Sequence, residues 1–285
     1  MSLEVRPLDA PLGAEIVGLD TRRPPDEGTL AIIEQALIEH IAIVLPEAAD
    51  DPDWLLAIGR RAGPLIPHVL DQYHHPATPE ISIVAFNADG PEARTTPRPA
   101  GSFWHSDLSY EAAPADAIFL YADRLPSKGG DTLVADMRGA YEALPEATQR
   151  RIDGLRATHR WGYRVDGAQP DLNDDQRQLI DDVVHPVVRT HPRSGRKALF
   201  VSPGYTVAIL GLEPAESDEL LAELFDHALK PEFQYRHLWR PGHLLGVDNR
   251  ASMHCAIADY DEPRRMLRMI VGCTDPAYTG VARRA

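Results

Sequence analysis

Closely spaced apolar segments near the end of this chain constrain its fold more than any other feature. Residues 233–239, 242–248, 251–256 and 266–272 each have the composition of a β-strand. Turn-forming residues such as Pro241 and Asn249 separate them, so the connections between strands are short. Many short strands joined by turns predict a core built from β-sheets.

The rest of the chain adds more strands and a small number of helices. We expect strands within residues 3–20 and at 40–46, 81–86, 117–122, 132–136, 185–192 and 198–201. We expect helices from residue 27 and at 53–62, 137–144, 145–155 and 213–229. The predicted fold class is therefore mostly β with peripheral helices (α+β), around a double-layer β-roll of the jelly-roll type.

The 285 residues fit one large domain or two small ones, and the chain has no internal repeat or low-complexity segment. We expect a single domain over residues 1–285, with an inserted acidic surface segment at about 156–185. Residues 87–101 are rich in Pro, Gly, Thr and Ala and lead into a histidine motif at 104–107. A long loop in that position predicts an active-site lid.

Charge and hydropathy exclude several classes of partner. The net charge of −14 argues against nucleic acid, because phosphate backbones repel an acidic surface. No apolar run approaches the roughly 20 residues that a membrane span needs, and residues 1–6 lack a signal-peptide core. Two cysteines are too few for a disulfide framework. We therefore expect a cytoplasmic protein with a small-molecule substrate, and the sequence is compatible with a homo-oligomer.

His105 and Asp107 stand two residues apart within the β-favouring stretch 103–110. On a strand, side chains at i and i+2 point to the same face, so this pair would present an imidazole and a carboxylate together. Such a pair supplies two ligands of a metal site. The alternative is a core histidine held by a neighbouring carboxylate, without any metal.

His254 lies on a late strand of the same β-rich region and is the candidate third ligand. In a jelly roll the early and late strands lie close together, so the distance along the chain is no obstacle. Two histidines and one carboxylate leave about three positions of an octahedral metal open, which is the pattern of non-haem Fe(II) oxygenases. A zinc hydrolase could use the same ligands, and His254 could also be an ordinary buried residue.

Arg264, Arg265 and Arg268 enter the last apolar strand, where a buried cation needs an anionic partner. A guanidinium is the natural bidentate partner of a carboxylate, and Thr132 could add a hydroxyl to the same group. Strand alternation puts Arg265 and Arg268 on opposite faces unless a bulge intervenes. The three arginines therefore compete for one role.

Four motifs in order resemble the taurine/2-oxoglutarate dioxygenase family (TauD/TfdA-like non-haem iron oxygenases). The similarity extends from about residue 5 to about residue 275, and the first strands and residues 190–201 share it. The motifs are Trp104-His105-Ser106-Asp107, residues 125–133 (LPSKGGDTL), residues 248–254 (DNRASMH) and Arg264-Arg265.

The resemblance implies a double-stranded β-helix (cupin-like) core, Fe(II) and 2-oxoglutarate. By position it assigns His105, Asp107 and His254 to iron, and Thr132 and Arg265 to the distal carboxylate of 2-oxoglutarate. Substrate would bind near His68, Tyr110, Arg268 and the loop before Phe103. The implied reaction hydroxylates a small organic substrate, expected to be acidic, while O₂ and 2-oxoglutarate give succinate and CO₂.

The chain departs from this family at one informative place. Sulfonate-binding members carry a second arginine four residues beyond the one for 2-oxoglutarate, and counting from Arg265 that position is Met269. Either a deletion brings Arg268 into place or the second arginine is missing, so a taurine-like substrate is not expected. Two other classes stay open: a zinc hydrolase on the same ligands, and a metal or small-ligand binding module without turnover.

Overall fold

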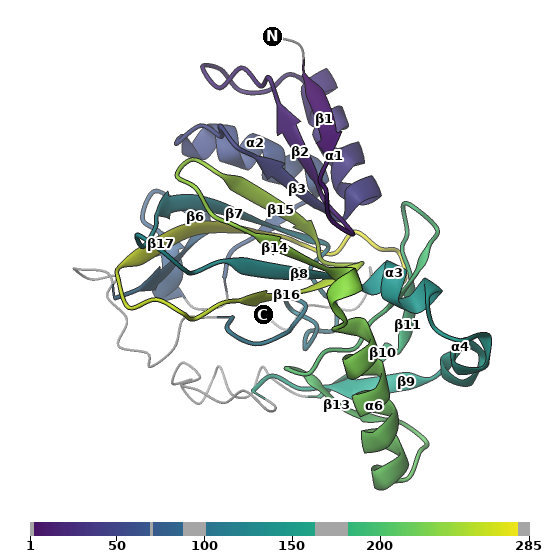
Figure 1. Cartoon of the computed structure of the whole chain (residues 1–285). Helices are drawn as coiled ribbons and strands as arrows, with labels where there is room; N and C mark the ends of the chain where they lie inside the picture. The colour runs from purple at the N-terminus through teal and green to yellow at the C-terminus, as the bar shows by residue number, and fades with distance from the viewer. Residues whose placement is uncertain (1–2, 69–70, 88–100, 163–181, 279–285) are drawn as a thin grey trace.

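The computed structural model describes residues 3–68, 71–87, 101–162 and 182–278 (Figure 1). Its helices are α1 (Glu27–His40), α2 (Pro52–Ala62), α3 (Met137–Glu142), α4 (Glu146–Ile152) and α6 (Pro214–Ala228), with 3-10 turns η1 (Asp71–Tyr73) and η2 (Pro231–Phe233). Its strands are β1 (Glu4–Pro7), β2 (Ala14–Val17), β3 (Ala42–Leu45), β4 (Leu65–Ile66), β5 (His74–His75), β6 (Thr78–Phe86), β7 (Ala117–Arg124), β8 (Thr132–Asp136), β9 (Arg156–His159), β10 (Val183–Pro186), β11 (Val188–Thr190), β12 (Lys197–Leu199), β13 (Thr206–Ile209), β14 (Gln234–His237), β15 (Leu244–Asp248), β16 (Ser252–Ala256) and β17 (Arg264–Val271).

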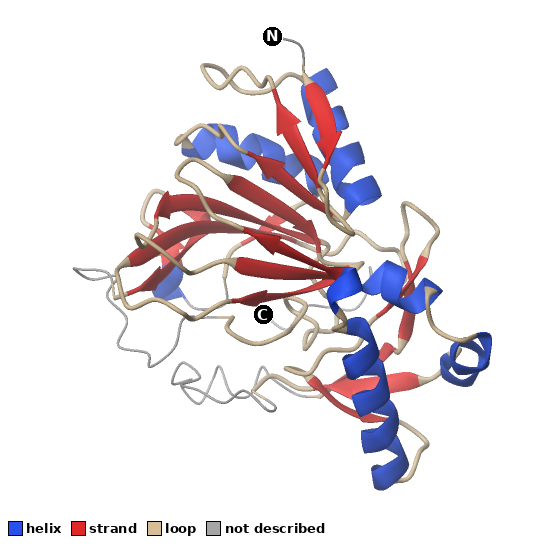
Figure 2. Cartoon of the chain, viewed as in Figure 1, coloured by secondary structure: helices blue, strands red, loops and turns tan. Residues whose placement is uncertain are grey.

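Two sheets form the core of the molecule. The large sheet has the order β1-β2-β3-β15-β7-β17-β6-β5, with β4 also paired to β17, and the small sheet has the order β14-β8-β16. Neighbours in both are antiparallel except β2 and β3, which are parallel. The prediction of a mostly β, jelly-roll fold with peripheral helices is confirmed (Figure 2).

Helices α1 and α2 cover the outer face of the large sheet (Figure 1). Each helix starts at an aspartate whose carboxylate accepts a backbone N–H of the first turn: Asp26 for α1 and Asp51 for α2. Their apolar faces pack on the sheet, where Leu37 and Trp54 belong to the same buried cluster as Phe119 of β7. This cluster removes the outer face of the sheet from water.

Side-chain alternation then decides what enters the space between the two sheets. On β8, Val134 faces the large sheet, whereas Ala135 belongs to a second core behind the small sheet. On β17, Leu267 and Met269 pack under the helices, and Ile270 faces inward. The inward positions of β8, β16 and β17 therefore meet in one interior.

The second core lies between the small sheet and the helices α3 and α6. The sheet β10-β9-β13 and the pair β11-β12 complete this side of the molecule (Figure 1). The two ends of the predicted inserted segment, at about 156–185, form the strands β9 and β10, which pair with each other. Residues 163–181 and most of the predicted lid, 88–100, lie outside the described residues. No helix in the described ranges is long and apolar enough to cross a membrane.

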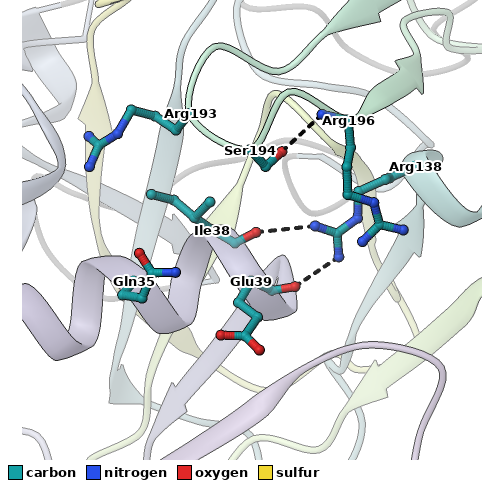
Figure 3. Close-up of a pocket in the computed structure, with 7 residues that line it drawn as sticks. All are labelled: Gln35, Ile38, Glu39, Arg138, Arg193, Ser194 and Arg196. Carbon is teal, nitrogen blue, oxygen red and sulfur yellow. Dashed lines mark hydrogen bonds between the residues drawn. The ribbon is translucent and has the colours of Figure 1, made fainter.

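A polar pocket of about 230 Å³ lies where α1, α3 and the turn after β11 meet (Figure 3). Arg138 donates to the carbonyl oxygens of Ile38 and Glu39 and so satisfies the end of α1. The other two arginines of the pocket, Arg193 and Arg196, each make an ion pair with a glutamate. The pocket therefore ties α1 to the second core, and its cations already have partners.

A buried pair of histidines makes the second core sensitive to acid. The rings of His159 and His185 lie 5.1 Å apart, and His159 stacks on Phe200. Burial and the neighbouring His185 ring lower the pKa of His159 to about 3, and burial also lowers the pKa of His185 to about 4. Both rings are neutral in the folded protein at pH 7.

We expect His159→Phe to reduce the loss of stability in acid. A histidine whose pKa falls on folding takes up a proton only on unfolding, so its contribution is complete above pH about 6.5 and declines below it. Between pH 7 and 5 the wild type should lose about 2 kcal/mol more unfolding free energy than the variant. Urea unfolding across this pH range measures the difference, and parallel pH profiles would contradict the assignment.

Candidate active site

His105 and His254 form the centre of the inward-facing cluster. His254 is the central residue of β16, the edge strand of the small sheet. His105 pairs with it as an antiparallel bridge, and the two residues exchange both backbone hydrogen bonds, at 3.0 and 2.8 Å. Directly opposite residues of such a pair project to the same face, and their ring centroids lie 4.3 Å apart. Two imidazoles from positions 149 residues apart are thereby fixed side by side.

Asp107 reaches the same point by a turn and not by the expected strand. Only His105 of the stretch 103–110 is paired, and the chain turns through residues 107–110. Leu108 has φ 55°, a left-handed conformation that is costly for a branched side chain. The predicted convergence is present, since His105 Nε2 and Asp107 Oδ1 are 3.5 Å apart, but strand alternation is the wrong reason for it.

Asn249 holds this turn against the strand that carries His254. Its Oδ1 accepts the Asp107 N–H at 2.8 Å, and its Nδ2 donates to the carbonyl oxygens of Asp107 and Ala115, both at 2.9 Å. The Ser106 hydroxyl adds a bond to the carbonyl of Ser252 at 2.8 Å. These bonds replace the ladder that a continuous strand would have supplied.

The three candidate ligands fit a metal ion. His105, Asp107 and His254 each offer one ligand atom, and these atoms lie within 4.8 Å of one another. His105 Nδ1 lies 2.7 Å from the Phe103 carbonyl, so Nδ1 carries the proton of the neutral ring and Nε2 keeps the lone pair that a metal ion needs. Asp107 Oδ2 is buried without a hydrogen-bond partner among the described residues. An unpartnered buried carboxylate oxygen is costly for a folded protein unless a cation joins it.

The site keeps its groups in the protonation states that ligands need. Burial alone would raise the pKa of Asp107, but the Arg268 guanidinium holds it well below its usual range. Burial and the neighbouring His105 lower the pKa of His254 to about 3. A charged carboxylate beside neutral imidazole is the donor set of a divalent metal.

Strand β17 brings two arginines to the interior, Arg264 and Arg268. Of the two arginines that the family resemblance implies, Arg265 and Arg268, only Arg268 is one of them. Arg268 Nη1 lies 3.7 Å from Asp107 Oδ2, so Arg268 faces the candidate ligands. Arg265 lies on the opposite face, where it pairs with Asp123 of β7. A register shift between Arg265 and Met266 in the pairing with β7 accommodates that contact. Arg265 and Arg268 therefore lie on opposite faces of β17, as strand alternation predicts.

Arg264 occupies the place that the sequence suggested for Arg265. Its guanidinium carbon lies 5.9 Å from the ring centroid of Trp239 and 5.6 Å from that of Tyr260. Arg264 is only 5% exposed, and its Nε has no hydrogen-bond partner among the described residues. Trp239 also donates its indole N–H to the hydroxyl of Thr132. Arg264 and Thr132 thus share a neighbour, and a buried cation in this position is suited to pair with an anion.

Aromatic side chains form a wall beside Asp107 and Arg268. The Tyr110 and Tyr205 ring centroids lie 4.9 Å apart, and Tyr205 also meets the edge of the His105 ring. Burial, with Asp107 nearby, raises the pKa of Tyr110 above its usual range, so its hydroxyl stays protonated. Tyr110 therefore lies near the candidate ligands. His68 packs edge-on against Tyr73 after β4, and the substrate-binding roles of His68 and Tyr110 stay predictions.

Sequence reasoning leaves Arg264 as one of three competing arginines, the family resemblance selects Arg265 instead, and neither finds Tyr205 or Trp239. A signal for Arg264 was present, because it and Arg268 are four residues apart and a strand places such positions on one face. The two aromatic residues carried no comparable signal. Their neighbours are defined only by the fold.

Comparison with known proteins gives consistent results. The family model described as "Taurine catabolism dioxygenase TauD, TfdA family" matches residues 4–271. An alpha-ketoglutarate-dependent 2,4-dichlorophenoxyacetate dioxygenase of Cupriavidus pinatubonensis is 34% identical, covering 89% of this chain and 92% of its own. A pentalenolactone F synthase of Streptomyces arenae is 32% identical over 96% of each chain. A solved structure of AAD-2 with Mn(II) and N-oxalylglycine is 28% identical with a TM-score of 0.79, over 97% of this chain and 99% of that one.

We expect Asn249→Ala to weaken metal binding more than its effect on stability explains. The change removes three buried hydrogen bonds, two of them to Asp107, and residues that orient ligands typically change metal affinity about 10–100-fold. Calorimetric titration with Mn(II) measures the affinity. Ser217→Ala, which removes a buried hydroxyl bonded to the Ile209 N–H in the second core, is the control for general destabilisation. Equal Mn(II) affinity in wild type and Asn249→Ala would contradict the positioning role.

Proposed function

The chain belongs to the taurine catabolism dioxygenase TauD, TfdA family, and on this premise we propose that it oxidises a small organic acid with Fe(II) at His105, Asp107 and His254. It is a 2-oxoglutarate-dependent dioxygenase that acts on a small organic substrate. In this reaction O₂ gives one oxygen atom to a substrate C–H bond and one to succinate, and 2-oxoglutarate loses CO₂. Atoms and electrons balance without any other reductant.

One observation carries the proposal: Arg264 and Arg268 lie four residues apart on the inner face of β17, Arg268 beside the ligand Asp107 and Arg264 beside the aromatic rings of Trp239 and Tyr260. A zinc hydrolase on the same ligands has no use for two interior arginines. A site that binds two anionic small molecules, 2-oxoglutarate and an acidic substrate, needs one arginine for each of them. The same pair argues against a binding module with a single ligand.

Iron fits the donor set and supplies the chemistry of O₂ activation when bound. The protein's own groups orient the ligands: the His105–His254 bridge fixes both imidazoles, and Asn249 fixes Asp107. All three ligand side chains are almost completely buried, so water has restricted access to the reacting groups. Fe(II) is the natural metal for ligands that leave several positions open.

Arg264 and Thr132 bind the distal carboxylate of 2-oxoglutarate in this proposal. A buried guanidinium in contact with two aromatic rings has little hydration to lose and forms a strong bidentate pair with a carboxylate. Thr132 lies directly opposite His237 on β14 and shares Trp239 with Arg264. The solved relative with N-oxalylglycine supports a diacid here, because that ligand is 2-oxoglutarate with an N–H in place of one CH₂.

Arg268 binds the anionic group of the primary substrate. It pairs only distantly with Asp107, at 3.7 Å, and a metal ion on that carboxylate would leave its charge available. Tyr110 and Tyr205 supply an apolar wall beside it, which favours an acid with an aromatic or bulky apolar body. The relative that acts on 2,4-dichlorophenoxyacetate is consistent with that class. Met269 does not mark a missing second arginine in this proposal, because the spacing of four residues is counted from Arg264.

We further propose that residues 1–285 form one domain and that the enzyme works in the cytoplasm, with or without self-association. The core clusters on both faces of the small sheet share its strands, which supports one folding unit. Two cysteines without a disulfide are consistent with a reducing compartment.

Arg264→Ala should raise the KM for 2-oxoglutarate by about 100-fold, because a buried charge-assisted pair is lost. Arg265→Ala, the matched control one residue away, should change it by less than about threefold, since its partner Asp123 lies on the opposite face. Succinate formation against 2-oxoglutarate concentration measures both variants. A larger effect of Arg265→Ala would show that the register assigned to β17 is wrong.

Arg268→Ala should raise the KM for an acidic substrate and leave that for 2-oxoglutarate nearly unchanged. Succinate release in a panel of aryloxy acids, sulfate esters, sulfonates and amino acids first identifies an acid that stimulates turnover. The neutral amide or ester of that acid is the matched control, because it has nearly the same shape and carries no negative charge. If the neutral compound stimulates the wild type as well as the acid does, Arg268 is not an anion-binding residue.

A further inference from the structure

Trp239 contacts both groups that are proposed to bind 2-oxoglutarate. It lies two residues beyond the end of β14, and its indole Nε1 lies 3.0 Å from Thr132 Oγ1. Its ring centroid also lies 5.9 Å from the guanidinium carbon of Arg264. The contacts join β8 and β17, which belong to different sheets. Trp239 thus connects the two halves of the co-substrate site.

The contact with Thr132 restricts the direction of the Thr132 hydroxyl proton. A hydroxyl has one donor and two acceptor positions, whereas an indole N–H can only donate. Because Trp239 occupies an acceptor position of the Thr132 oxygen, the Thr132 proton must point elsewhere. A carboxylate, which only accepts, is the matching partner for that proton.

The surroundings of Trp239 hold its ring in place. The His237 ring meets it edge-on at 4.4 Å between centroids, and His237 is itself at hydrogen-bond distance from Tyr235 and His243. Burial, the neighbouring His243 and Arg264 lower the pKa of His237 to about 3, so the ring beside Trp239 carries no charge at pH 7. A neutral histidine here does not compete with Arg264 for the anion.

We propose that Trp239 is a positioning residue for the co-substrate: its N–H orients the Thr132 hydroxyl as a donor to the distal carboxylate of 2-oxoglutarate, beside Arg264. The inference rests on the proposed function, because it presupposes that Thr132 and Arg264 bind that carboxylate. It goes further by assigning the orientation of the donor to a third residue that need not touch the ligand.

The test is a double-mutant cycle of Trp239→Phe and Thr132→Val, read by calorimetric binding of N-oxalylglycine to the Mn(II)-loaded enzyme. Phenylalanine keeps a ring face for Arg264 and removes the N–H. We expect Trp239→Phe to weaken binding about 5- to 10-fold in the wild-type background. In the Thr132→Val background, which has no hydroxyl to orient, the same change should weaken binding by less than about twofold. The KM for 2-oxoglutarate should rise in parallel while kcat stays unchanged.

Trp54→Phe is the matched control. Trp54 is 2% exposed under the large sheet, and its Nε1 has no hydrogen-bond partner among the described residues, so the same substitution removes an unused N–H. It should leave N-oxalylglycine affinity unchanged. Thermal unfolding of each variant shows whether the site variants are folded at the temperature of the titration.

The outcomes separate this inference from the function on which it rests. If Thr132→Val weakens binding but Trp239→Phe does not, or if Trp239→Phe has the same effect in both backgrounds, the positioning role is wrong and the co-substrate site stands. If the Mn(II)-loaded wild type does not bind N-oxalylglycine, or if Thr132→Val and Arg264→Ala both bind it normally, the proposed site fails and the role of Trp239 fails with it.

Discussion

The backbone bridge between His105 and His254 is the interaction on which the site depends. It joins a loop to the edge of the small sheet and makes two imidazoles neighbours through two short hydrogen bonds. Asn249 then brings the carboxylate of Asp107 to the same point. A metal ion held there adds its binding free energy to the folded state only, because the three ligands meet only when the sheet has formed.

A buried cluster of charged and polar groups around Asp248 supports the turn that carries Asn249. Asp248, next to Asn249, is fully buried and forms a bidentate pair with Arg250 and a bond of 2.9 Å with His191. Burial by itself raises the pKa of Asp248, but Arg250 and His191 hold it below its usual range. A charged and fully bonded carboxylate fixes the turn that presents Asn249. The interior arginines of β17, in contrast, have no such bidentate partner among the described residues, so the charge of each is less completely compensated than that of Arg250.

The sequence predicted the layers of this fold well because its short apolar segments are separated by turn-forming residues. The boundaries expected for β8 agree with the structure to the residue, and α2 and α6 differ by one residue at most at each end. The stretch 103–110 was mistaken for a strand because its composition favours one. Its polar groups bond instead to Asn249 and Ser252, more than 140 residues away, and no local pattern reports such a partner.

Within the site, residue types were predictable and register was not. Three arginines near the start of β17 fit equally well by composition, and the family motif favoured Arg265. The side of the strand is decided by the outer core, since Leu267 and Met269 must pack under α1 and α2. That places Arg265 outward, and Arg264 with Arg268 inward. The aromatic neighbours Trp239 and Tyr205 become visible only when the sheets are assembled.

The central claim is that His105, Asp107 and His254 hold iron in an interior that also binds 2-oxoglutarate. Its most direct test is the absorption spectrum of the protein mixed with Fe(II) and 2-oxoglutarate without O₂. We expect a weak visible charge-transfer band that needs both additions and disappears in His254→Ala. No band in the wild type, or an unchanged band in His254→Ala, would contradict the claim.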